Sequence, residues 1–101
     1  MDNKVSKVWL TANSSNNGTV IVSTTNAKEY RFTCRYGVIC SEVIVFSDII
    51  NLLKSDSTYQ YYTQWYEKSY LRIVFTNNTI KANLMYNGSS VTDGYILAQY
   101  R

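Results

Sequence analysis

The chain of 101 residues contains no histidine, which removes the commonest general base near neutral pH. Serine and cysteine nucleophiles that histidine would activate are excluded with it, and so are most zinc sites. The seven acidic residues are scattered, and no two are predicted to share a strand face as paired-carboxylate chemistry requires. The four glycines each fit a turn, so no phosphate-binding glycine-rich loop is indicated. We therefore predict that the protein is not an enzyme and uses no cofactor or metal.

Long apolar runs and clustered charge are also missing. The longest apolar stretches, such as Val43–Phe46, are far too short to cross a bilayer, and the first residues lead into no apolar signal core. The net charge of +3 comes without any run of Lys or Arg, so obligate nucleic-acid binding is not implied. The sequence thus predicts a cytoplasmic protein that makes no membrane contact.

Only two cysteines are present, which is too few for a disulfide-dense scaffold. If residues 36–38 form a three-residue hairpin loop around Gly37, Cys34 and Cys40 become cross-strand neighbours at a separation that permits a disulfide. The alternative is two reduced thiols in the core. We favour the reduced state because disulfides are uncommon in the cytosol.

Strand patterns fill the first half of the chain, whose length fits a single domain over residues 1–101. Residues 29–36 alternate between aromatic or cysteine and polar side chains, as in a half-buried strand. Runs of β-branched and aromatic residues over 5–12 and 19–25 precede it, so the front third is predicted to be a three-strand meander. A further strand is predicted over 38–46, buried on both faces from Val43 onward.

The middle of the chain is predicted to be helical. Ser47 can cap a short helix over 48–54, and Ser57 with Gln60 fits a capping box that opens a second helix over 58–69. On that second helix two aromatic stripes lie side by side. One stripe contains Tyr59, Tyr62 and Tyr66, and the other contains Tyr61 and Trp65.

The last third is predicted to be a second meander. A two-residue turn at Asn77-Asn78 pairs the strands on either side of it so that apolar side chains share one face. The pairs on that face are Phe75 with Ile80, Ile73 with Ala82, and Leu71 with Leu84. The opposite face carries Tyr70, Arg72, Val74, Lys81, Asn83 and Met85, and a last strand follows over 95–100. The expected fold class is α+β, an antiparallel sheet of two meanders that flank a central helical segment.

Aromatic residues are the most informative feature. Ten Tyr and two Trp are more than a core of this size can hold, so several are expected at the surface. Tyrosine offers a large, rigid contact area with a polar tip, and recognition surfaces are rich in it. We predict a surface that binds a protein partner or a second copy in a homo-oligomer. Its residues are Tyr59, Tyr61, Tyr62, Trp65, Tyr66 and Tyr70.

An alternative is binding of single-stranded nucleic acid or of a nucleotide, including a cyclic nucleotide. Aromatic and guanidinium groups are interspersed on the predicted strands. The same is seen in proteins that bind single-stranded nucleic acid by stacking its bases on aromatic side chains. Strand alternation, however, places the two front arginines opposite the two front tyrosines. The residues for this alternative are Tyr30, Arg31, Arg35, Tyr36 and Arg72.

In being short, rich in Asn and Tyr and free of catalytic signatures, the chain resembles the small orphan proteins of phages and archaeal viruses. The resemblance lies in size and composition. It implies an interaction protein in the host cytoplasm that inhibits a host or defence factor, or one that sequesters a signalling nucleotide.

Overall fold

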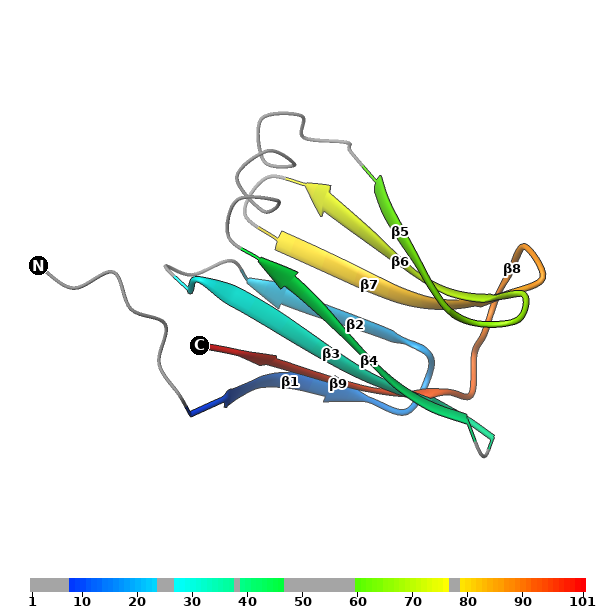
Figure 1. Ribbon diagram of the computed structural model, residues 1–101, viewed down its shortest axis with the longest axis horizontal. Coiled ribbons are helices and arrows are strands. Elements are labelled where there is room, and N and C mark those ends of the chain that lie inside the picture. Colours follow the sequence, from blue (N-terminus) through cyan, green and yellow to red (C-terminus); the bar gives the residue numbers. More distant parts are fainter. Residues whose placement is uncertain (1–7, 24–26, 38, 47–59, 77–78) are drawn as a thin grey trace, which may run out of the picture.

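The computed structural model describes residues 8–23, 27–37, 39–46, 60–76 and 79–101. Within these ranges nine strands form two antiparallel sheets (Figure 1). Sheet A contains, in spatial order, β1 (Leu10–Ser15), β9 (Tyr95–Tyr100), β3 (Glu29–Tyr36) and β4 (Ile39–Phe46). Sheet B contains, in order, β2 (Thr19–Ser23), β7 (Thr79–Tyr86), β6 (Ser69–Thr76) and β5 (Gln60–Tyr66), and the short β8 (Ser89–Ser90) pairs with β7.

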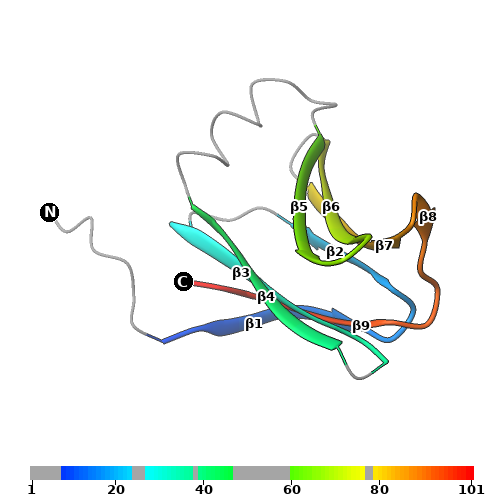
Figure 2. The same ribbon diagram turned by 45° about the vertical axis from the view of Figure 1, so that its right-hand side comes forward.

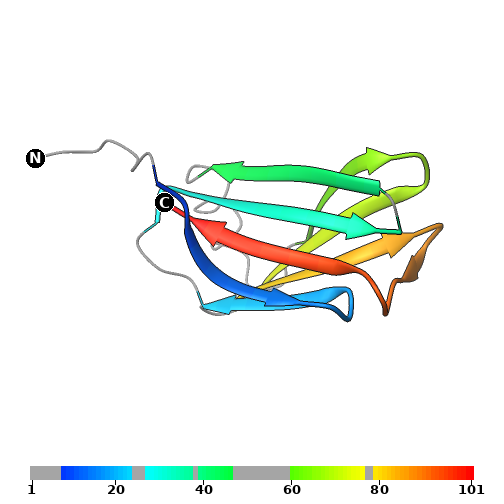
Figure 3. The ribbon, with the colours of Figure 1, turned by 90° about the horizontal axis from the view of Figure 1, so that it is seen from below.

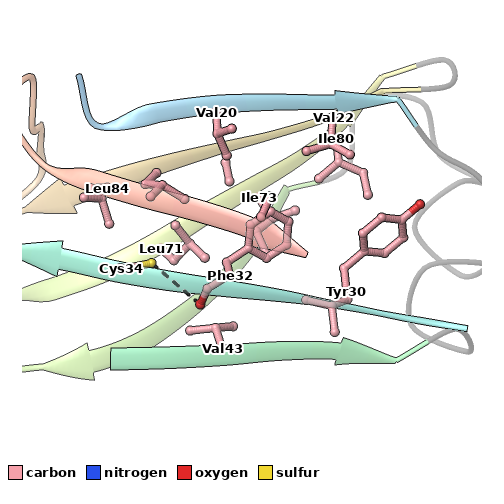
Figure 4. Packing of buried hydrophobic residues seen from close by; sticks show 14 of the residues in the cluster. Val20, Val22, Tyr30, Phe32, Cys34, Val43, Leu71, Ile73, Ile80 and Leu84 are labelled. Carbon is pink, nitrogen blue, oxygen red and sulfur yellow. Dashed lines mark hydrogen bonds between the residues drawn. The ribbon is translucent and has the colours of Figure 1, made fainter. Parts of the chain in front are cut away.

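The two sheets form a β-sandwich around one hydrophobic core. Figure 2 shows the sheets as separate layers, and Figure 3 shows sheet A in front with its strands in the order given above. Alternate side chains of both sheets point into the space between them (Figure 4), and Phe32, Leu71 and Ile96 are fully buried there. Burying each such side chain contributes about 1.5–3 kcal/mol, so the shared core holds the layers together.

The predicted pairing of β6 with β7 is confirmed. Phe75 lies opposite Ile80, Ile73 opposite Ala82 and Leu71 opposite Leu84, and all six residues are buried. A shift of one residue would turn these side chains toward solvent, which is why the apolar pattern alone fixes this register. The turn residues Asn77 and Asn78 lie outside the described ranges.

The front meander is a wrong prediction, although strands do occur near the expected positions. β1 pairs with β9 and β2 pairs with β7, so these consecutive strands lie in different sheets. Gly18 makes the crossing between them, with its N–H bonded to the Gly94 carbonyl and its own carbonyl bonded to the Leu84 N–H. The expected burial of both faces of β4 is wrong as well, because Ile44 is 37% exposed on the open face of sheet A.

The α+β class is also wrong, because the described ranges contain strands and no helix. Residues 60–66 of the expected helix over 58–69 form β5, while the expected helix over 48–54 lies outside the described ranges. Residues four apart lie on the same face of a helix, with its period of 3.6, and of a strand, with its period of 2. Tyr62 therefore shares a face with Tyr66, and Tyr61 with Trp65, in either structure. Pairing with β6 and the high strand propensity of Tyr, Trp and Thr favour the strand. No helix in the described part of the chain could span a membrane.

The two cysteines lie on opposite faces of sheet A. Tyr36 pairs with Ile39, so the turn contains two residues instead of the expected three, and Cys34 faces Ser41 while Cys40 faces Arg35. Cys34 is buried, Cys40 is exposed and both are free. Burial raises the pKa of the Cys34 thiol to about 12, with the charge of nearby Cys40 as the smaller cause. The cross-strand pair that the sequence suggested therefore does not form.

Candidate binding surface on sheet B

β5 divides the aromatic residues of the chain between two faces. Tyr62 and Tyr66 point outward and are 55% and 53% exposed, whereas Tyr61 and Trp65 are half-buried and pack against the core. The division follows from the two-residue period of a strand. Of the six residues predicted to bind a partner, Tyr61 and Trp65 thus serve the interior, and Tyr59 lies outside the described ranges.

Tyr70 on β6 joins the two outward tyrosines. It lies opposite Gln64 of β5, and its ring centroid is 5.5 Å from that of Tyr62 at an interplanar angle of 59°. Tyr62, Gln64 and Tyr70 line an open depression of about 530 Å³. We call Tyr62, Gln64, Tyr66, Tyr70 and Arg72 the tyrosine surface. The rings are tilted and not stacked, so ring faces and edges are both presented at the depression.

Gln64 is a residue of this surface that the sequence interpretation missed. Its side-chain amide donates to the Tyr66 carbonyl at 3.3 Å, and the neighbouring Gln60 accepts a hydrogen bond from the Tyr62 hydroxyl. A two-residue period applied to residues 60–66 would have placed both glutamines beside the tyrosines. The assumed helix separated them instead.

Arg72 forms the positively charged part of the tyrosine surface. It lies opposite Tyr62 on one side and Asn83 on the other. Its Nε atom is buried and has no hydrogen-bond partner among the described residues, and the same is true of the Oδ1 atom of Asn83. Asn83 uses its other amide atom, Nδ2, to donate to Thr19 Oγ1 at 2.8 Å. Two buried polar atoms of opposite type therefore lie on adjacent strands without partners among the described residues.

The ion pairs found among the described residues lie on sheet A. They join Arg31 to Glu42 and Arg101 to Glu29. The described strands of sheet B contain two cations, Arg72 and Lys81, and no acidic residue. The described strands of sheet B consequently carry a net positive charge.

The five residues of the nucleic-acid alternative are not brought together. Tyr30 is buried in the core, and Tyr36 is half-buried with its ring centroid 6.2 Å from that of Tyr86. Arg31 and Arg35 point outward from sheet A, while Arg72 lies on the outer face of sheet B. The residues therefore belong to three different surroundings, and no shared stacking platform results.

A second cluster, on the outer face of sheet A, was not foreseen. The guanidinium carbons of Arg31 and Arg101 lie 4.4 and 4.1 Å from the centroid of the Trp9 ring. Arg31 also donates to Gln99 Oε1 through Nε at 2.9 Å. Cation–π contacts of this kind contribute about 0.5–1 kcal/mol at exposed sites. These arginines are already engaged within the monomer, which sets them apart from Arg72.

Comparisons of the chain with protein-family models, curated proteins and solved structures found no match. The tyrosine surface is therefore interpreted from its own chemistry.

Proposed function

We propose that the protein is a small binding protein whose tyrosine surface contacts a protein partner. The observation that carries this proposal is the pair Tyr62 and Tyr66, each more than half exposed on a strand whose remaining aromatic residues pack inward. Large exposed rings beside a depression are typical of recognition surfaces, because tyrosine loses little conformational entropy when it becomes fixed in an interface.

The polar groups of the tyrosine surface support specific binding of a partner through hydrogen bonds as well as apolar contact. The hydroxyls of Tyr62 and Tyr70 and the Gln64 amide can donate and accept hydrogen bonds at the depression, and the tyrosine rings that line it contribute apolar area. Such a surface satisfies the polar groups of a partner while it buries apolar area. The partner can be another protein or a second copy of this chain.

The test begins with native mass spectrometry on protein taken directly from cells, which identifies a bound protein or a self-complex. Affinity for that partner is then measured by titration calorimetry for Tyr62→Ala and Tyr66→Ala. We expect each change to weaken binding by more than about 1 kcal/mol without lowering the unfolding midpoint, because both rings point away from the core.

Two further variants control this test. Ile21→Ala removes a side chain that is 55% exposed on β2, at the opposite edge of sheet B, and it should bind as the wild type does. Trp65→Ala should instead lower the unfolding midpoint, because this ring packs on the core. Wild-type affinity in both Tyr62→Ala and Tyr66→Ala would remove the basis of the proposal.

We also propose a cytoplasmic location, which the two free cysteines support because cytosolic thiols are kept reduced. Inhibition of a host or defence factor by a virus-encoded protein remains a proposal supported by composition. Binding of single-stranded nucleic acid remains a prediction, and the dispersal of its five residues gives it no support.

A further inference from the structure

We propose that Arg72 is the anion-binding centre of the tyrosine surface and that the protein partner supplies an acidic segment whose Asp or Glu carboxylate binds its guanidinium. This inference rests on the proposed function and names the chemistry of the partner. Three features of the described residues support it: the charge of sheet B, a hydrogen-bond donor of Arg72 without an acceptor, and the position of Arg72 beside Tyr62 and Tyr70.

The described strands of sheet B carry an unbalanced positive charge. These described strands carry Arg72 and Lys81 and no acidic residue, so within this layer neither cation has a carboxylate beside it. Glu67 shares the two-residue β5–β6 turn with Lys68, and the turn begins beyond Ser69, which lies about 10 Å along β6 from Arg72 at the rise of an extended strand. Charge complementarity therefore favours a negative partner group.

Arg72 has a hydrogen-bond donor without an acceptor among the described residues. A guanidinium has five N–H donors in a planar fork that fits the two oxygens of a carboxylate. The Nε–H of Arg72 is buried and finds no acceptor in the part of the chain that the structure describes, whereas Arg31 and Arg101 each contact a carboxylate and the Trp9 ring. A partner carboxylate bound to the guanidinium, with a small shift of the side chain toward it, would give the Nε–H an acceptor that the described residues do not provide.

Aromatic rings and a second cation lie near Arg72 on sheet B. Tyr62 lies directly opposite Arg72, and Tyr70 precedes it by two residues on the same face of β6. The neighbouring rings of Tyr62 and Tyr70 reduce the exposure to water of an ion pair formed there and so strengthen its attraction. Lys81 of β7 lies opposite Val74, the next outward residue of β6, and can attract a second carboxylate of the same segment.

A protein segment is favoured over nucleic acid because the described strands of sheet B offer two cations. Phosphate-driven binding of a nucleic-acid strand generally uses more cations and then depends steeply on salt. Two cations among tyrosines and glutamines suit a short segment with one or two carboxylates and apolar neighbours.

The test uses the full chain and a random library of 12-residue peptides displayed on phage. We expect the selected peptides to share an Asp or Glu at a recurring position. The best sequence, made as a synthetic peptide, should bind Arg72→Gln at least tenfold more weakly than the wild type. Changing its shared acid to the amide should cause a similar loss, and the two changes together should lose little more than either alone.

Matched variants separate this result from general effects of charge and folding. Arg35→Gln removes an exposed cation from sheet A and should leave affinity unchanged. Arg72→Lys keeps the charge but not the planar fork, and it should bind with intermediate affinity. Thermal midpoints of all variants show whether each one is folded.

The outcomes distinguish this inference from the proposed function. Selected peptides that need Tyr62 but not Arg72 would overturn the acidic-segment inference and leave the tyrosine surface as a binding site. Peptides that need neither residue would count against both. Displacement of the selected peptide by a 12-residue thymidine oligonucleotide, with affinity falling steeply as salt is added, would replace the acidic segment by nucleic acid.

Discussion

At the residue scale, the register of β3 with β4 places the two cysteines on opposite faces of sheet A and so gives their thiols different reactivity. Cys34 points into the core, where burial raises its pKa to about 12, and Cys40 points to solvent. The thiolate is the reactive form, so we expect one fast equivalent in a reaction with Ellman's reagent at pH 8. Cys40→Ser should abolish this fast phase and Cys34→Ser should keep it. Equal rates for both thiols would show that the register is wrong.

The raised pKa of Cys34 also predicts a dependence of stability on pH. The unfolded chain releases this proton near its ordinary pKa of 9.0, whereas the folded chain holds it up to about 12. The contribution to stability is therefore complete below pH 9 and is lost as the pH rises toward 12. Urea unfolding between pH 8 and pH 10.5 should show a steeper decline for the wild type than for Cys34→Ala. Parallel declines would mean that Cys34 titrates alike in both states.

Gly18 and Gly88 give a matched pair for backbone strain. Both have left-handed φ angles, 80° and 83°, but a Cβ on Gly18 would lie 1.9 Å from the Val91 carbonyl oxygen, while none of the described atoms lies within 4 Å of one on Gly88. Gly88→Ala should cost about 1 kcal/mol in free energy of unfolding. Gly18→Ala should cost about 3 kcal/mol or more, because the crossing between the sheets must also shift. Chemical denaturation measures both, and equal losses would argue against the close approach at Gly18.

At the element scale, β5 shows where sequence interpretation reached its limit. The separation of Tyr62 and Tyr66 from Tyr61 and Trp65 could be predicted, because a four-residue spacing has the same meaning in a helix and in a strand. The element type could not, because the aromatic spacing of β5 fits a helix and a strand alike and specifies no register against β6, although the two strands form a local hairpin. Wrong element type in turn hid Gln64 and suggested that Trp65 was a binding residue.

β6 and β7 were predictable for the opposite reason. Their apolar residues alternate along both strands, and only one register places all six on the same face. β1 and β2 had no such signal, because their partners β9 and β7 are distant in the sequence.

The side chain of Asn13 links β1 of sheet A to β2 of sheet B by a hydrogen bond. Asn13 Nδ2 donates to the Ile21 carbonyl at 2.8 Å, and the register of β1 with β9 shifts just before Asn13. We expect Asn13→Ala to lower the free energy of unfolding by about 1 kcal/mol. Ser14→Ala is the control, because the Ser14 side chain makes no hydrogen bond to the rest of the described structure. If both variants unfold at the wild-type denaturant concentration, this tie does not contribute to stability.

At the scale of the whole molecule, the sandwich determines which aromatic rings remain available. The inner faces enclose Tyr30 completely, whereas Tyr62, Tyr66 and Tyr86 remain 44–55% exposed. The sequence predicted this surplus of surface tyrosines from their number alone. It could not predict which rings face outward on sheet B, because that depends on two layers built from strands far apart along the chain.

Nitration of the free protein with tetranitromethane, followed by peptide mass spectrometry, tests the availability of the tyrosine surface most directly. Tyr62 and Tyr66 should be nitrated early, and Tyr30 should react only after unfolding. Bound partner should protect Tyr62 and Tyr66 but not Tyr86. Early nitration of Tyr30, or protection of Tyr62 and Tyr66 in the free monomer, would contradict the account.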